Sequence, residues 1–237
     1  MSDPEEQKYR IECVKAGDMH PILNFIEKNY FRSDPLLISL KCFHQRMDKN
    51  LEFYIKQSLL QGLSLVAKEN SRENKILGVA VNQKSCKWTA NSIDELGEIC
   101  ENINTSKLFH IWALLARESE SEIHDYQSTN TIFNLGLISV HRELKHRRLQ
   151  AELAFHSLCL ARDLNYELAR FDTTNEFTMK IAEEANMTKI WEVPYKNILC
   201  GDGKTPIILP NKPHTHAAVY CINLDELNLK NLSDSTN

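Results

Sequence analysis

Residues 131–164 read TIFNLGLISVHRELKHRRLQAELAFHSLCLARDL, and this stretch decides the fold. Its first ten residues are nearly all apolar, which is typical of a strand covered on both faces of a sheet. A basic turn follows, and residues 149–164 then carry apolar side chains over a length that suits a helix. Because YELARFDTT (166–174) returns as a strand, the stretch predicts a β-α-β unit.

Further strands and helices are predicted on both sides of this unit. Before it, the pattern predicts a strand at 9–16, helices at 19–31, from 35 and at 48–61, strands at 63–69 and 75–83, and a helix at 107–123. After it, the pattern predicts a helix at 177–187 and strands at 189–195 and 216–224. Residues 84–105 are polar and are interpreted as a surface insertion. The expected fold is α/β (α+β), with a mixed central sheet of about six to seven strands flanked by helices on both faces.

Composition and charge exclude several classes of protein. No Pro- or Gly-rich linker divides the 237 residues, so we expect a single domain at 1–224 and a polar tail at 225–237. The formal net charge of −4 argues against nucleic acid as the main partner. The polar amino terminus and the lack of a long apolar run predict no membrane partner and a cytoplasmic location. Seven dispersed cysteines without a C-x-x-C pair, and two histidines (His214 and His216) without acidic neighbours, predict no metal.

Three segments carry a resemblance to a known family. LISVHRELKHRRLQAEL (137–153) is similar to the strand, charged turn and amphipathic helix of the GNAT acetyltransferases. FDTTNEFTMKIAEEANM (171–187) is similar to a segment that reads roughly D-A-T-x-x-F-S-x-K-I-x-E-K-L-G-M in insect arylalkylamine N-acetyltransferases. NFIEKNYFRSDPL (24–36) resembles their helix ending in F-x-x-E-P-L. The resemblance covers nearly the whole chain and implies a GNAT fold.

The resemblance also implies acetyl-CoA as co-substrate, held by a strand edge and by the start of a helix. The family pattern of the phosphate turn is [RQ]-x-x-G-x-[GA]; here Lys145 takes the first position, and Arg148 and Gln150 replace the two glycines. Side-chain charge would then hold the diphosphate in place of glycine amides, although a solvated basic turn or a localisation signal is an alternative interpretation. The residues expected to contact the cofactor are Ile138, Ser139, Val140, Lys145, His146, Arg147, Arg148, Leu149, Gln150 and Asn175.

Candidate catalytic residues follow from the same segments. Asp34 occupies the place of the family's glutamate and would act as the base, which requires burial to raise its pKa. Asp followed by Pro is equally the signature of a helix N-cap. Thr174 and Thr178 fall on serine positions of the family and would relay a proton or orient the thioester, or else serve as cap or surface residues. Thr173 and Glu176 form the S/T-x-x-E pattern of a capping box.

The sequence thus predicts an acetyl-CoA-dependent N-acetyltransferase. It would transfer acetyl to the primary amine of a small arylalkylamine or polyamine by direct attack in a ternary complex, and a monomer is expected. A second hypothesis is a GNAT-fold protein that binds CoA or another ligand without efficient catalysis. It is favoured by the altered phosphate turn, by aspartate at position 34, and by Ala182, which stands where many GNAT enzymes have a tyrosine acid.

Overall fold

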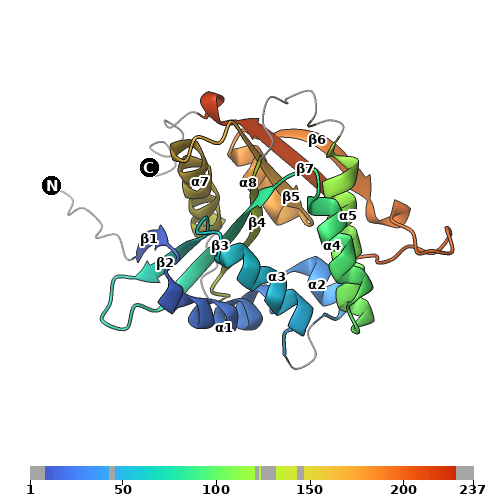
Figure 1. Cartoon of the computed structure of the whole chain (residues 1–237), viewed down its shortest axis with the longest axis horizontal. Helices are drawn as coiled ribbons and strands as arrows, with labels where there is room; N and C mark the ends of the chain where they lie inside the picture. Colours follow the sequence, from blue (N-terminus) through green and yellow to red (C-terminus); the bar gives the residue numbers. More distant parts are fainter. Residues whose placement is uncertain (1–8, 43–45, 121–122, 124–131, 143–146, 228–237) are drawn as a thin grey trace.

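A seven-stranded mixed sheet runs through the molecule (Figure 1). The computed structural model describes residues 9–42, 46–120, 123, 132–142 and 147–227. The strands lie in the order β1-β2-β3-β4-β5-β7-β6, and β4 with β5 is the parallel pair. Their bounds are β1 Tyr9–Cys13, β2 Leu65–Glu69, β3 Ile76–Ser85, β4 Ile132–Val140, β5 Leu168–Thr173, β6 Thr188–Pro194 and β7 His216–Asn223.

Helices cover both faces of this sheet, as predicted. One face packs against α1 Met19–Asn29, α2 Pro35–Leu40, α3 Lys49–Leu59, α4 Thr89–Glu98 and α5 Ile103–Glu118. The other face packs against α7 Arg147–Asp163 and α8 Glu176–Glu184. Each face has its own apolar core, and the sheet separates the two. The expected α/β fold with a mixed sheet is confirmed.

A β-bulge in β4 changes which side chains face which core. Leu135 pairs with Asn82 and Leu137 with Val81, so Gly136 is an extra residue on this strand. A Cβ atom on Gly136 would lie 2.7 Å from the Val81 carbonyl oxygen, which explains why glycine stands there. Leu135 packs on the α7 side and Leu137 on the α1 side. The bulge therefore sets the orientation of every β4 side chain after it.

The supposed surface insertion at 84–105 is instead part of the fold. It forms α4, which packs against α5 and buries Ala90 and Ile93. Gly97 allows the close approach, because a Cβ atom there would lie 3.2 Å from the His110 ring. Helix α5 begins at Ile103, earlier than predicted, because the Asn102 side chain accepts hydrogen bonds from the first amides. Small residues at the contact hid this helix from an apolar-periodicity test.

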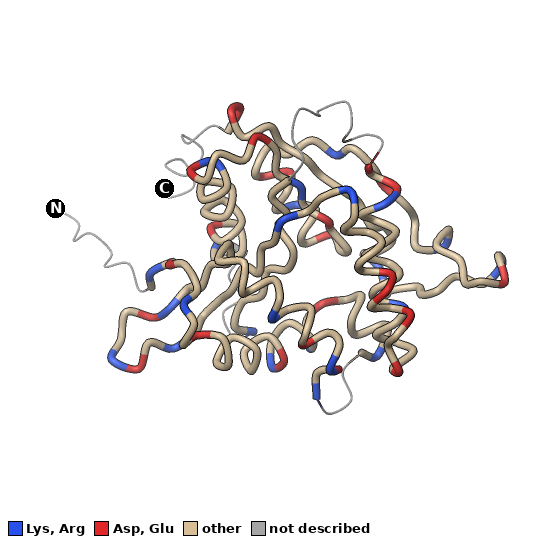
Figure 2. The backbone as a smooth tube through the Cα atoms, viewed as in Figure 1, with Lys and Arg blue, Asp and Glu red and all other residues tan. Residues whose placement is uncertain are grey.

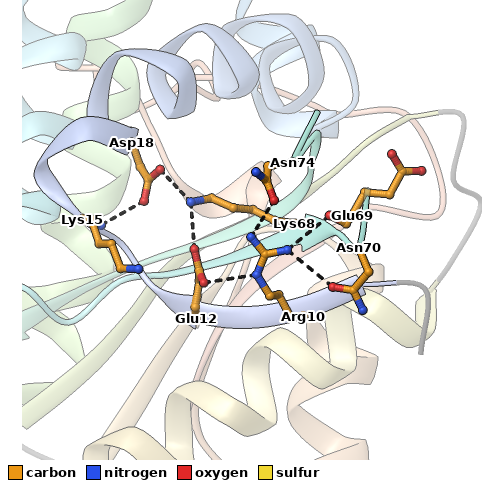
Figure 3. Close-up of polar contacts among 8 residues, drawn as sticks. All are labelled: Arg10, Glu12, Lys15, Asp18, Lys68, Glu69, Asn70 and Asn74. Atoms are coloured by element: carbon orange, nitrogen blue, oxygen red, sulfur yellow. Dashed lines mark hydrogen bonds and ion pairs between the residues drawn. The ribbon is translucent and has the colours of Figure 1, made fainter. Parts of the chain in front are cut away.

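Charged residues are interspersed along the described chain (Figure 2). Figure 3 shows one polar cluster at the sheet edge, where the Lys68 ammonium lies 2.8 Å from Glu12 and 2.7 Å from Asp18. These ion pairs join β1, β2 and the turn that precedes α1, and Lys68 is buried among them. The cluster thereby fixes where α1 begins relative to the sheet.

At the carboxyl end, Leu227 packs into the α7-side core, and residues 228–237 lie outside the described residues. The division into a domain at 1–224 and a tail at 225–237 stays a prediction. None of the described helices has the length and apolarity needed to cross a membrane.

Candidate active site

Strands β4 and β5 separate partway along their length. They pair from Phe133 with Ala169 to Leu135 with Phe171, and beyond this point no described strand pairs with the β5-facing edge of β4. Ile138 and Val140 still pair with β3 on the other edge. The open edge leaves backbone N–H and C=O groups free to bind an extended ligand, as an added strand would.

Ser139 lies on this open segment and adds a second unmet polar group. Ile138 and Val140 pack on the α7 side, so alternation directs Ser139 toward the α1 side. Its side chain is 2% exposed, and its Oγ has no hydrogen-bond partner among the described residues. Buried hydroxyls are nearly always bonded, so an unmet one beside an open edge fits a ligand-binding cleft. Residues 138–140 thus offer an open backbone edge and an unmet hydroxyl to an extended ligand.

The basic turn is described in part. Lys145 and His146 lie outside the described residues, whereas Arg147 begins α7. The Arg148 guanidinium lies 3.0 Å from the Glu152 carboxylate, whose other oxygen accepts a hydrogen bond from the Tyr9 hydroxyl. Part of the Arg148 charge is therefore already compensated.

The next two residues of α7 differ in exposure. The Leu149 side chain is buried in the α7-side core, and Gln150 is half-buried. Leu149 can therefore contact a cofactor only through its backbone. The amides of this first helical turn have no partner within the helix and form a natural site for an anion.

A buried carboxylate, Asp34, stands at the start of α2. Its Oδ1 accepts a hydrogen bond from the Leu37 amide at 3.0 Å, so the N-cap interpretation is confirmed. Its Oδ2 accepts a hydrogen bond from Asn175 Nδ2 at 3.1 Å, and the residue is 6% exposed. Burial raises the pKa of Asp34 to about 6, against hydrogen bonds from Leu37, Leu36 and Asn175 that favour the charged form.

Two tyrosines, Tyr30 and Tyr195, interact electrostatically with this carboxylate. Tyr195 follows β6, is 1% exposed and donates its hydroxyl proton to the Thr174 carbonyl oxygen at 2.6 Å. Tyr30 lies in a short helical turn before α2, and this turn contacts β4. Desolvation, followed by the Asp34 charge, raises the pKa of both phenols well above the ordinary value. Both phenols thus stay protonated, and Tyr195 was not identified from the sequence, because no motif marks it.

Asn175 joins this carboxylate to α8. Its Oδ1 accepts hydrogen bonds from the Phe177 and Thr178 amides, both at 3.0 Å, so Asn175 is the N-cap of α8. The predicted capping box is wrong, because the Thr173 hydroxyl instead donates to the Ala218 carbonyl across the sheet at 2.9 Å. The single Asn175 side chain therefore both begins the helix and holds Asp34.

The two candidate threonines lie on either side of this cap. Thr174 is buried and precedes the N-cap, so it is not one helical turn from Thr178 as expected. The Thr178 hydroxyl donates to the Asn175 carbonyl at 3.0 Å. The structure thus brings Asp34, Thr174, Asn175 and Thr178 together, with Tyr195 as a further member.

The Asn29 side chain accepts a hydrogen bond from the Arg142 amide at 3.2 Å, which ties the chain before Asp34 to the end of β4.

Comparison with solved structures identifies this architecture. The chain superposes on arylalkylamine N-acetyltransferase 2 from Aedes aegypti with a TM-score of 0.82 and 19% identity, over 92% of this chain and 100% of that one. The chain has the GNAT fold. The Drosophila melanogaster polyamine N-acetyltransferase gives a TM-score of 0.78 and 16% identity over 91% and 99% of the two chains. The expected resemblance to insect N-acetyltransferases is confirmed at the level of fold.

The GNAT fold does not by itself fix the chemistry. The carboxyl-terminal condensation domain of Ebony, solved with β-alanyl-dopamine, also superposes, with a TM-score of 0.69 and 16% identity over 91% and 99% of the chains. No family model and no curated protein matches the sequence. Within the described part of the chain, no group of three or more His, Cys, Asp or Glu side chains is arranged to hold a metal ion. The activity must therefore be argued from the site itself.

Proposed function

We propose that the protein is an acetyl-CoA-dependent N-acetyltransferase that acts on the primary amine of a small arylalkylamine or polyamine. The observation that carries this proposal is the buried Asp34 carboxylate, held by Asn175, which follows Phe171, the last β5 residue that pairs with β4, along the chain. Burying a charged carboxylate among apolar groups lowers the stability of the fold, and carboxylates of this kind are found most often at functional sites. The fold and the open strand edge supply a matching place for the acyl donor.

The open edge of β4 would hold the donor. Ile138 and Val140 offer backbone groups to the pantetheine amides, and Ser139 offers a hydroxyl that lacks a partner within the described chain. The diphosphate would bind at the first turn of α7, with charge from the turn at 145–148. Acetyl-CoA supplies an activated acetyl carbonyl, and the protein supplies position and proton transfer.

Asp34 would act as the base. An amine is protonated at neutral pH, so a proton must leave before its nitrogen attacks the acetyl carbonyl directly in the ternary complex. With a pKa near 6, Asp34 is mostly ionised at pH 7 and is a stronger proton acceptor than an ordinary aspartate. Both carboxylate oxygens already accept protein hydrogen bonds, so the proton would reach Asp34 through a water molecule.

The thiolate that leaves must then gain a proton. Thr174 and Thr178 remain the candidates from the sequence, and Tyr195 joins them because its phenol stays protonated beside Asp34. The Tyr195 and Thr178 protons are directed at the Thr174 and Asn175 carbonyls respectively. The Asn175 amide is occupied by Asp34 and by the helix start, so we assign it to positioning the base.

A second function is favoured by the phosphate turn. Arg148 stands in place of a family glycine and is already paired with Glu152. A protein that binds CoA, or another ligand, without efficient acetyl transfer would keep the open β4 edge and tolerate this change.

Titration calorimetry with acetyl-CoA, followed by thiol release against a panel of small amines, separates these functions. Binding with thiol release supports the enzyme, binding without release supports the second function, and no binding excludes the enzyme and the CoA-binding form of the second function. In an active protein, Asp34→Ala should lower kcat/KM at least about tenfold. Asp48→Ala removes a matched N-cap aspartate from α3 and should leave the rate near the wild-type value. An unchanged rate in Asp34→Ala would remove this residue from the mechanism.

A further inference from the structure

One phenol beside the proposed base has no role in the function proposed above, and it belongs to Tyr30. The Tyr30 side chain is half-buried, and its hydroxyl makes no hydrogen bond with another described residue. By contrast, the Tyr195 and Thr178 hydroxyls already donate to backbone carbonyls. Hydroxyl groups inside proteins are nearly always hydrogen-bonded, so the Tyr30 phenol is left for a ligand or water.

Tyr30 lies one helical turn before Asp34. The Asp34 amide donates to the Tyr30 carbonyl oxygen at 2.9 Å, which is the hydrogen bond of an α-helical turn. Side chains separated by one such turn are neighbours, with Cβ atoms about 5–6 Å apart. The Tyr30 phenol accordingly interacts electrostatically with the Asp34 carboxylate and with the Tyr195 phenol. The free hydroxyl therefore belongs to the surroundings of the proposed base.

The turn that carries Tyr30 also meets the strand proposed to hold the acyl donor. This short turn, Tyr30–Arg32, contacts β4. The residue before it, Asn29, accepts a hydrogen bond from the Arg142 amide at 3.2 Å, just beyond the end of β4. The edge of β4 that faces β5 is unpaired after Leu135 in the described chain. One turn of the backbone thus contacts both the base and the strand that would present the thioester.

The surroundings of Tyr30 suit a hydrogen-bond donor better than an acid. Desolvation, followed by the Asp34 charge, raises the pKa of Tyr30 well above the ordinary value. A general acid works best with a pKa near the working pH, whereas a neutral phenol donates a hydrogen bond without losing its proton. The negative charge of Asp34 also disappears when Asp34 takes the amine proton, as the attacked carbonyl oxygen becomes negative.

We infer that Tyr30 is a catalytic residue whose phenol donates a hydrogen bond to the acetyl carbonyl oxygen of the acyl donor. As the amine nitrogen forms its bond to the carbonyl carbon, the π electron pair moves onto this oxygen, and Tyr30 stabilises the resulting oxyanion. The pair then returns, the C–S bond breaks and the thiolate leaves with the electrons of that bond. Tyr30 keeps its proton throughout, and the thiolate gains its proton from one of the donors named above. The inference rests on the proposed function and adds an oxyanion donor to it.

Infrared spectroscopy of the bound thioester tests this contact without requiring turnover. The full-length protein is mixed with acetyl-CoA that carries an isotope label in its acetyl carbonyl, and the stretching frequency is compared between wild type and Tyr30→Phe. A hydrogen bond weakens the C=O bond, so the frequency should be lower in the wild type and should rise in the variant. Tyr166→Phe should keep the wild-type frequency. It is the matched control, because Tyr166 is also half-buried, makes no hydrogen bond through its hydroxyl with another described residue, and packs on the α7 side of the sheet.

Rate and stability measurements show whether the contact serves catalysis. In a protein that releases thiol, Tyr30→Phe should lower kcat at least about tenfold and change the KM for acetyl-CoA less than about threefold, because an oxyanion forms only along the reaction. The urea midpoint should stay at the wild-type value, since the hydroxyl has no hydrogen bond within the described protein to lose. Tyr195→Phe should instead lower the midpoint, because it removes the bond to the Thr174 carbonyl.

The outcomes separate this inference from the proposed function. Thiol release by the wild type with an unchanged frequency in Tyr30→Phe would overturn only the inference, and a rate loss without a frequency change would favour proton donation by Tyr30 in its place. A frequency rise in Ser139→Ala, and not in Tyr30→Phe, would assign the contact to Ser139 and overturn it as well. The expected frequencies without thiol release from any amine would support the contact and contradict the enzyme. Absence of acetyl-CoA binding would contradict both.

Discussion

Replacement of Asp34 by asparagine should reveal the energetic cost of the buried charge. Burial raises the Asp34 pKa from 3.8 to about 6, and each pKa unit corresponds to about 1.4 kcal/mol. Because the folded-state pKa is raised, the protonated carboxyl stabilises the fold fully below the unfolded-state pKa, and this stabilisation is lost as the pH rises through 6. At pH 8 the wild-type protein should therefore carry a penalty of about 3 kcal/mol in its free energy of unfolding. A neutral amide side chain escapes this penalty.

Urea unfolding at pH 4, 5, 6, 7 and 8, followed by circular dichroism, measures the effect. The Asp34→Asn variant loses a charge-assisted hydrogen bond from Asn175, which lowers its free energy of unfolding by about 1 kcal/mol at every pH. In addition to this constant loss, the free energy of unfolding of the variant should rise relative to that of the wild type by about 2 kcal/mol from pH 4 to pH 8. Asp48→Asn, at the half-buried N-cap of α3, is the matched control for the loss of an N-cap carboxylate. A pH-independent difference for Asp34→Asn would refute the buried charge on which the proposed function depends.

Three further substitutions test other parts of the structure. Gly136→Ala places a methyl group 2.7 Å from the Val81 carbonyl and should destabilise the protein by about 1–3 kcal/mol in denaturant titration; an unaffected midpoint would mean that the bulge adapts. Tyr195→Phe leaves the Thr174 carbonyl without its donor, which should cost about 1–3 kcal/mol of stability, whereas a loss of rate without a loss of stability would identify Tyr195 as the proton donor. Leu153→Ala in α7 removes a fully buried side chain and should lower the free energy of unfolding by about 2–5 kcal/mol, and a change below about 1 kcal/mol would contradict the packing of α7 on β3.

The sequence predicted the elements that have a strong apolar period. The central strand at 131–140 and the helix at 149–164 match β4 and α7 closely, because both bury large aliphatic side chains at regular intervals. It missed α4, whose buried residues include the small Ala90 and Gly97. Small residues permit close packing without raising the hydrophobicity that a pattern test measures.

The sequence predicted individual residues of the candidate site but not the contacts between them. Asp34 and Asn175 were both identified, but each with a separate role. Their hydrogen bond joins residues 141 positions apart, and no local pattern reveals such a distant pair. Tyr195 was missed for the same reason, because its place beside Asp34 depends on the path of β6 in the folded sheet. A short segment of sequence can identify a candidate residue, whereas the neighbours of that residue are known only once the chain is folded.

The hydrogen bond between Asp34 and Asn175 also sets the order in which the protein can become functional during synthesis. Strand β5, which leads into Asn175, pairs with β4 on one edge and with β7 on the other. A nascent chain that exposes Asp34 early must wait for at least 141 further residues before this carboxylate can gain its Asn175 partner, since contacts so distant along the chain form late. Until then Asp34 remains hydrated with an ordinary acidity. The environment of the proposed base is thus completed only after the first five strands of the sheet have been made.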